Sequence, residues 1–202
     1  ARIWRKVGEI QRDHAKNLHR AIEAFQWIID LRPSDRDVAY ALDAIVKIKI
    51  ELEEWADVEE GLRRLIELHQ SDERLRASLM VQTAEVVGQR LERHFEAIDL
   101  LEAALVLTPL ESKARSMMMA YLDDEATRDR AAGILLPLYE AEHNWEALLD
   151  LEERQARRMD PGVERTRALM KVAQSYESRL LEPLKAFRIF ADLRILGRIA
   201  RR

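Results

Sequence analysis

Residues 4–11 read WRKVGEIQ and residues 21–33 read AIEAFQWIIDLRP, and these two segments decide the fold class. Their large apolar residues recur every three or four positions, which is the period of an α-helix with one buried face. Gly8 and Ala21 are small, as is required where one helix approaches its partner closely. Pro33 ends the second helix, because proline lacks the backbone N–H that a helix needs. The two segments therefore predict an antiparallel pair of helices joined by a short turn.

The pattern of small and large residues recurs along the chain. Residues 80–87 and 169–176 align with residues 4–11, and in each copy a small residue and then a large one follow on the next helix. The small residues are Gly8, Ala84 and Ala173 on the first helices and Ala21, Ala97 and Ala186 on the second; the large residues are Phe25, Leu101 and Phe190. A single pair of this kind cannot bury its apolar faces, so the repeats predict pairs stacked around a continuous core.

The composition also favours helices. Strong helix formers dominate, strand-like alternation is missing, and six glycines and five prolines leave room for few, short loops. The predicted fold class is all-α, an α-solenoid of stacked antiparallel helix pairs, about eleven helices in number. The expected helices cover residues 3–17, 19–32, 36–52, 55–69, 73–89, 93–107, 111–122, 125–142, 144–158, 163–180 and 183–197. Pro137 lies inside one of them and predicts a kinked helix, with a break into two short helices as the alternative.

We expect a single array over residues 1–202. The chain starts with Ala1 rather than methionine, so we also expect it to be a piece of a longer protein.

The spacing resembles the tetratricopeptide repeat (TPR), whose signature is W-x2-L-G-x2-Y, then A-x3-F, then P. The first unit carries the resemblance, through Trp4, Val7, Gly8, Ala21, Phe25 and Pro33. Gln11 replaces the tyrosine of the family, the unit at 36–69 is degenerate, and 111–124 adds an extra helix. The half-repeat relatives in RNA-processing scaffolds are similar as well, and they remain an alternative.

The resemblance implies a concave groove, lined by the first helices of successive pairs, that holds a peptide or a partner segment. By position, the groove residues would be Arg5, Glu9 and Arg12 from the first unit, Glu85 and Gln89 from the third, and Gln174 and Glu177 from the last. Glu9, Glu85 and Gln174 stand where the family's carboxylate clamp needs asparagine, so a chaperone-tail clamp is not expected. The expected function is a non-catalytic protein-interaction scaffold. A regulatory or architectural arm of a larger enzyme or RNA-processing assembly is the alternative.

No pattern in the sequence predicts chemistry. The chain has no cysteine, its five histidines lack the spacing of a zinc pair, and it has no glycine-rich phosphate loop or nucleophile elbow. We therefore expect no catalytic, cofactor-binding or metal-binding residue and no enzymatic activity. No run of about twenty apolar residues predicts a membrane span. The pI of 5.8 argues against a nucleic-acid channel. We expect a cytoplasmic protein with a protein partner.

The two terminal helices differ in their apolar faces. Ile3, Trp4, Val7 and Ile10 form one narrow stripe on the first, which suits a helix with one side in water. On the last helix the apolar residues cover about half the circumference at 100° per residue, namely Phe187, Ile189, Phe190, Leu193 and Leu196. That width predicts further repeats downstream or self-association through the C-terminal helix. Trp27 is predicted to pack, with a binding anchor as the alternative.

Overall fold

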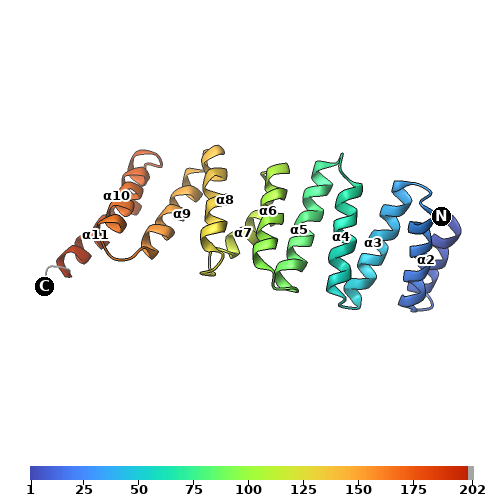
Figure 1. Ribbon diagram of the computed structural model, residues 1–202. Helices are drawn as coiled ribbons and strands as arrows, with labels where there is room; N and C mark the ends of the chain where they lie inside the picture. Colours follow the sequence, from blue (N-terminus) through green and yellow to red (C-terminus); the bar gives the residue numbers. More distant parts are fainter. Residues whose placement is uncertain (200–202) are drawn as a thin grey trace. The chain divides into compact units, whose positions relative to one another are not determined.

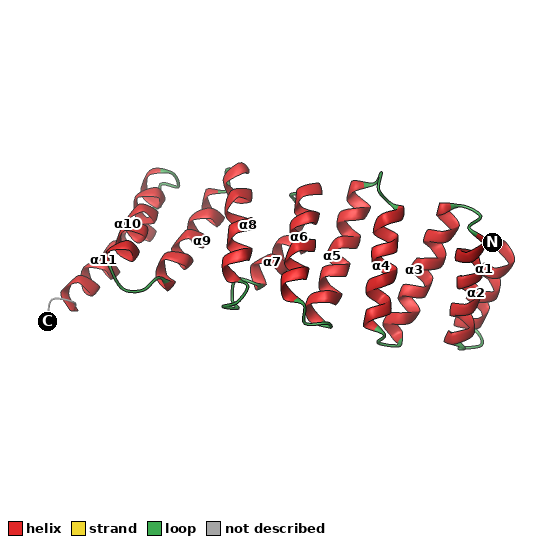
Figure 2. Cartoon of the chain, in the orientation of Figure 1, coloured by secondary structure: helices red, strands yellow, loops and turns green. Residues whose placement is uncertain are grey.

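The computed structural model describes residues 1–199, with side chains described for residues 1–193. These residues form helices and turns and contain no strand (Figure 2). The eleven helices are α1 Arg2–Asp13, α2 Leu18–Leu31, α3 Asp35–Glu51, α4 Trp55–Leu68, α5 Glu73–Gln89, α6 His94–Leu107, α7 Ser112–Ala120, α8 Arg128–Ala141, α9 Trp145–Arg158, α10 Val163–Ser178 and α11 Pro183–Ile199. Each helix expected from the sequence is confirmed, and most boundaries agree within two residues. The first helix is the largest miss, since it ends at Asp13 rather than at residue 17.

The chain divides into two compact units, the first from Ala1 to Arg128 and the second beginning at Asp129. In the first unit each helix from α1 to α7 packs against the next one in sequence (Figure 1). Several large apolar side chains between α1 and α4 are fully buried, among them Phe25, Ile28, Ile48 and Val58. In the second unit α10 packs between α9 and α11, around Leu149, Leu169, Tyr176 and Ile189. The first unit, and α9 to α11 of the second, are therefore stacks of helices in chain order, while one array over residues 1–202 stays a prediction.

The close approach predicted at Gly8 is present. A Cβ atom on Gly8 would lie 2.7 Å from two ring carbons of Phe25, whose side chain is fully buried. The alanines at the equivalent positions, Ala84 and Ala173, are also fully buried. The small residues therefore let two helices of a pair approach, and the large residue of the second helix fills the space.

The turns inside the pairs share one backbone design. Gln11, Val87 and Tyr176 hold the same repeat position, and each carbonyl accepts a hydrogen bond from the backbone N–H six residues later. The turns before α4 and α9 use a bond to the carbonyl five residues earlier instead. In all five turns a non-glycine residue just before the second helix has a positive φ, and these residues are Lys16, Glu53, Glu92, His143 and Leu181. The helices joined in this way are α1 with α2, α3 with α4, α5 with α6, α8 with α9 and α10 with α11. The connections on either side of α7 lack this turn, which agrees with the extra helix expected there.

Arginines brace the turns that lead into several helices. Arg76, Arg115, Arg128 and Arg165 each donate to the backbone carbonyl six residues earlier, and the distance from Arg115 Nε to the Pro109 carbonyl is 2.7 Å. A second repeated contact joins a tryptophan at the start of one helix to the arginine that ends the next. The guanidinium carbon of Arg90 lies 4.6 Å from the ring centroid of Trp55, and that of Arg179 lies 4.3 Å from the ring centroid of Trp145. The same tryptophan–arginine contact thus occurs once in each unit.

α8 continues through Pro137 as one helix, so the alternative of a break is wrong. Trp27 packs as predicted: its ring stacks on that of Trp4 at 5.7 Å, although half of the residue stays exposed.

The interpretation of the first helix needs correction. Trp4 and Val7 are half-buried, but Ile3 is 77% exposed and Ile10 is 53% exposed. Helical periodicity groups these side chains on one side of α1, yet only part of that side faces α2 and α3. On α11, Ile189 is buried and Phe187 is 70% exposed, while Leu196 lies outside the described side chains.

We predict opposite effects for two Gly→Ala substitutions. Alanine at Gly8 gains about 1 kcal/mol of helix propensity, but its Cβ overlaps the enclosed Phe25 ring, so we expect a net loss of about 1 kcal/mol. Gly133 lies in α8 with nothing within 4 Å of the added Cβ. Gly133→Ala should raise the free energy of unfolding by about 0.5–1 kcal/mol. Urea unfolding followed by circular dichroism measures both, and equal stabilisation by the two substitutions would contradict the close approach.

Candidate functional site

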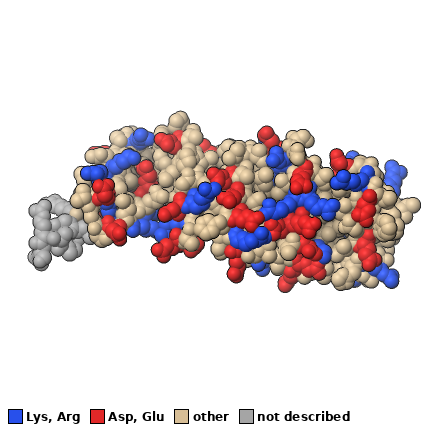
Figure 3. Space-filling model, in the orientation of Figure 1, with Lys and Arg blue, Asp and Glu red and all other residues tan. Residues whose placement is uncertain are grey.

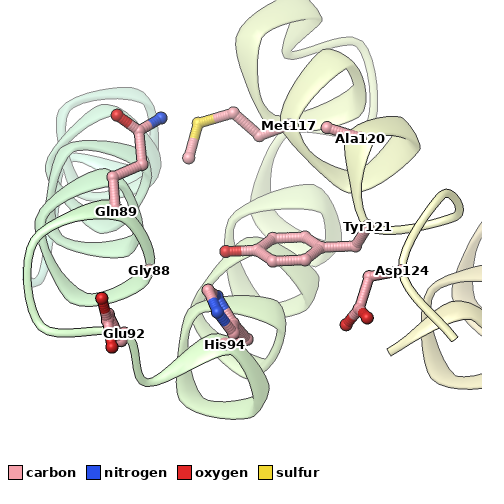
Figure 4. A pocket seen from close by; sticks show the side chains of 8 residues that line it. All are labelled: Gly88, Gln89, Glu92, His94, Met117, Ala120, Tyr121 and Asp124. Carbon is pink, nitrogen blue, oxygen red and sulfur yellow. The ribbon is translucent and has the colours of Figure 1, made fainter. Parts of the chain in front are cut away.

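A hollow of about 530 Å³ lies among α5, α6 and the end of α7, within the first unit (Figure 4). Its walls combine a bare backbone, an aromatic ring, a thioether, an amide, an imidazole and two carboxylates. The residues that line it are Gly88, Gln89, Glu92, His94, Met117, Ala120, Tyr121 and Asp124. This mixture of apolar walls and separate polar groups is typical of a surface that receives a ligand side chain.

Tyr121 divides the hollow. Its ring crosses the space with the hydroxyl toward Gly88, and Met117 and Gln89 lie on the other side of the ring from His94 (Figure 4). The hydroxyl reaches this place only because Gly88 has no side chain, since a Cβ there would lie 2.2 Å from it. Burial raises the pKa of Tyr121, and within the described part of the chain the hydroxyl has no hydrogen-bond partner. It is therefore a neutral donor and acceptor that stays available to a ligand.

The charge around the hollow is negative. Glu92 and Asp124 are exposed carboxylates at its edge, and Asp124 also accepts a hydrogen bond from the Thr127 hydroxyl at 3.0 Å. The His94 and Tyr121 rings meet edge to face, with centroids 5.9 Å apart. Carboxylates beside an aromatic ring favour a cationic guest.

Two of the predicted groove residues on α1, Arg5 and Glu9, form a cluster with Tyr40 of α3. The Tyr40 hydroxyl donates to Glu9 Oε1 at 2.6 Å, Arg5 Nε donates to the same oxygen at 3.1 Å, and the Arg5 guanidinium carbon lies 3.6 Å from the Tyr40 ring centroid. The pKa of Glu9 is lowered, first by the hydrogen bond from Tyr40 and then by that from Arg5. Arg5 also lines a hollow of about 620 Å³ together with Arg2, Arg36 and Asp37.

The other predicted groove residues have separate surroundings. Arg12 Nε donates to Asp13 at 2.7 Å, and Glu85 pairs with Lys113 of α7 at 2.6 Å. Gln89 follows Glu85 by one turn of α5 and lines the hollow beside Tyr121. In the second unit, Gln174 lines a hollow of about 500 Å³ along α10, and Glu177 is exposed one turn later.

The structure therefore brings together Arg5 with Glu9, whereas Glu85 pairs with Lys113 and only Gln89 lines the hollow around Tyr121. Sequence reasoning missed Tyr40, Gly88 and Tyr121, which belong to the same surfaces. Tyr40 lies in the degenerate unit and Tyr121 follows the extra helix, so the repeat signature assigns neither a position. The side chain of Tyr121 and the bare Cα of Gly88 come together only in the folded chain.

The charged surface is mixed in sign. On the face in view, basic and acidic side chains alternate (Figure 3). Four of them pair both within and between helices. Arg63 Nε lies 2.9 Å from Glu59 on α4, and Arg93 lies 2.8 Å from Glu96 at the start of α6. Between the two helices, each arginine also bonds the other's glutamate. Among the described residues, no cluster of His, Asp and Glu is arranged to hold a metal ion. Also within that part of the chain, none of the helices combines the length and hydropathy that crossing a bilayer requires.

The helix pairs, their shared turn and the small-to-large contact at their centre decide the architecture. The fold is TPR-like. No protein-family model matches the chain, and neither does any curated protein sequence. Among solved structures, the chain is similar to MamA, at 17% identity and a TM-score of 0.47, over 96% of each chain. It is also similar to a putative kinesin light chain with nearly identical TPR-like repeats from Podosopora anserina, at 14% identity and a TM-score of 0.40, over 100% of this chain and 96% of that one.

From the Arg5–Glu9–Tyr40 cluster we predict that one substitution, Tyr40→Phe, changes the pKa of Glu9 alone among the glutamates. Because the folded-state pKa of Glu9 is lowered, its interactions stabilise the fold above the unfolded-state pKa and are lost as the pH falls through the folded-state value. Tyr40→Phe removes the largest cause and should move the pKa of Glu9 up toward its ordinary range. Carbon-detected NMR titration of the glutamate carboxyls measures this shift. Tyr121→Phe is the matched control and should leave Glu9 unchanged; an unmoved Glu9 in Tyr40→Phe would contradict the assignment.

The hollow predicts a coupling between Gly88 and Tyr121. Gly88→Ala places a Cβ 2.2 Å from the tyrosine hydroxyl and 3.6 Å from the ring carbon that carries it, so removing the hydroxyl relieves most of the overlap. Gly88→Ala should therefore destabilise the chain less in a Tyr121→Phe background, with a coupling free energy of about 1–2 kcal/mol. Urea unfolding of the wild type, both single variants and the double variant completes the cycle. If the two changes in the free energy of unfolding are additive, the Tyr121 hydroxyl does not lie beside Gly88.

Proposed function

We propose that this TPR-like chain is a non-catalytic scaffold that binds a segment of a partner protein along the faces of its first helices. In the first unit the proposed binding residues are Arg5, Glu9, Arg12, Glu85 and Gln89, and in the second unit they are Gln174 and Glu177. The observation that supports the proposal is the hollow around Tyr121, where polar side chains from α5, from the start of α6 and from the residues after α7 converge.

The position of the hollows supports this proposal. Arg5, Gln89 and Gln174 were assigned to the groove by repeat position, and each of them lines a hollow on its own helix or helices. On a surface without such hollows, the exposed polar side chains would form hydrogen bonds to water alone. A ligand segment that crosses successive helices would meet one hollow after another within a unit.

The side chains that line the hollow around Tyr121 favour a basic side chain of the partner. A lysine or arginine side chain of the partner would place its aliphatic part on Met117 and the Tyr121 ring. Its charged end would lie near Glu92 and Asp124, and the Gln89 amide and the Tyr121 hydroxyl would complete its hydrogen bonds. The cationic surroundings of Arg5 would suit an acidic residue elsewhere in the same segment.

The test is a peptide selection. A display library of random twelve-residue peptides is selected on the chain, and we expect enrichment of sequences with lysine or arginine at one fixed position. Glu92→Lys with Asp124→Lys should weaken the selected peptides at least tenfold by isothermal titration calorimetry, because both carboxylates face the guest.

Glu60→Lys with Glu67→Lys is the matched control. Both glutamates are exposed on α4, so this variant has the same change in net charge away from the hollow. If the two double variants weaken peptide binding equally, the effect comes from net charge alone, which would contradict the proposed site. Selected peptides without a basic position would contradict the proposed guest.

A further inference from the structure

Thr127 holds together the corner of the chain that follows α7, and with it one wall of the hollow around Tyr121. Thr127 is 1% exposed, and its hydroxyl oxygen lies 2.9 Å from the Tyr121 carbonyl oxygen and 3.0 Å from Asp124 Oδ2. Arg128 braces the same corner, since its Nε donates to the Leu122 carbonyl at 3.1 Å. The two side chains therefore fix the backbone between Tyr121 and Asp124, both of which line the hollow (Figure 4).

The Thr127 hydroxyl has two acceptors but only one proton. A carbonyl oxygen and a carboxylate oxygen accept hydrogen bonds and donate none, so the hydroxyl either bonds one of them or shares its proton between both. The other buried threonine among the described residues, Thr83, has a single acceptor, the Leu79 carbonyl at 2.8 Å. The Asp124 carboxylate is thus held by a shared hydrogen bond and can accept further ones from a ligand.

The second carboxylate of the hollow is not held in this way. Glu92 is exposed in the turn before α6, and its side chain has no hydrogen bond or ion pair with another residue that the structure describes. A side chain without such contacts loses rotamer freedom when a ligand fixes it, which costs free energy. This entropic cost is smaller for Asp124, because Thr127 already restricts its carboxylate.

We propose that Asp124 is the principal carboxylate for the charged end of the partner's basic side chain, and that Thr127 is the residue that positions it. This inference rests on the proposed function of the hollow. An N–H group of the guest donates to Asp124, and the single proton of Thr127 then serves the Tyr121 carbonyl, so both acceptors are satisfied. Glu92 adds electrostatic attraction from the edge of the hollow.

Isothermal titration calorimetry with a basic peptide selected on the wild-type chain ranks the two carboxylates. Asp124→Asn should weaken this peptide about tenfold or more, because a hydrogen bond between two charged groups is lost. Glu92→Gln should weaken it about threefold or less, because an exposed carboxylate without a fixed position contributes little. A larger loss of affinity in Glu92→Gln than in Asp124→Asn would overturn the ranking.

Thr127→Val tests the positioning role, and Thr83→Val is its matched control, since each removes a buried hydroxyl with little change in volume. Thr127→Val should weaken the basic peptide about threefold to tenfold, the ordering cost of one released side chain, whereas Thr83→Val should leave the affinity unchanged. Thr127→Ser keeps the hydroxyl and should keep the wild-type affinity. Circular dichroism checks that each variant is folded.

A second peptide separates positioning from general damage to the hollow. It carries norleucine in place of the basic residue, so it has no charge for Asp124 to receive. Its affinity should be the same for Thr127→Val and for the wild type. Equal losses for the basic and the norleucine peptides in Thr127→Val would mean that Thr127 only maintains the local structure, which would overturn the positioning role.

Asp124→Glu tests the same role if Thr127→Val does not fold. This variant keeps the charge on an exposed residue but moves the carboxylate by one methylene group relative to Thr127, so we again expect a loss of about threefold to tenfold. Wild-type affinity in Asp124→Glu would show that charge alone is sufficient and would overturn the positioning role. Selected peptides without a basic position would overturn the proposed guest together with this inference, whereas the other contrary results overturn this inference alone.

Discussion

The contact between a small residue of one helix and a large residue of its partner controls the rest of this structure. Where Gly8 faces the Phe25 ring, the helices approach so closely that an added methyl group would overlap the ring. A pair locked at this distance buries its central side chains but retains an apolar face on each outer side. Each pair must therefore be covered by neighbours. The core that runs from α1 to α4 is a consequence of that requirement.

Helix positions and pair register could be predicted because they depend on periodicity, which is local. The turns could not. Lys16, Glu53 and Glu92 adopt positive φ without the glycine or asparagine that usually marks this conformation. Hydrogen bonds hold these turns instead, such as the one from the Asn17 N–H to the Gln11 carbonyl at 2.8 Å. The first helix was predicted too long for this reason, since residues 14–17 contain good helix formers whose backbone is used for the turn.

The candidate site was predictable only where it follows the repeat. Gln89 was assigned to the groove by its repeat position on α5, and it lines the hollow around Tyr121. Tyr121 and Tyr40 lie where the repeat is interrupted or degenerate, so their neighbours could not be inferred from spacing. The exposure of Ile3 and Ile10 was missed for a related reason. A hydrophobic stripe identifies the side of a helix that avoids water, but it does not say whether the chain supplies a neighbour for that side.

The hollow around Tyr121 exists because α7, the extra helix, is short. α7 has nine residues where α5 has seventeen; it starts beside Glu85, through Lys113, and ends with Tyr121 beside Gly88. It therefore flanks only the C-terminal part of α5 and leaves the Tyr121 hydroxyl there without a hydrogen-bond partner among the described residues. A half-buried hydroxyl without a partner lowers stability, and a stack of helix pairs can tolerate this loss because its core lies elsewhere. The regular pairs maintain the fold, and the irregular element creates the hollow at which we propose that a partner segment binds.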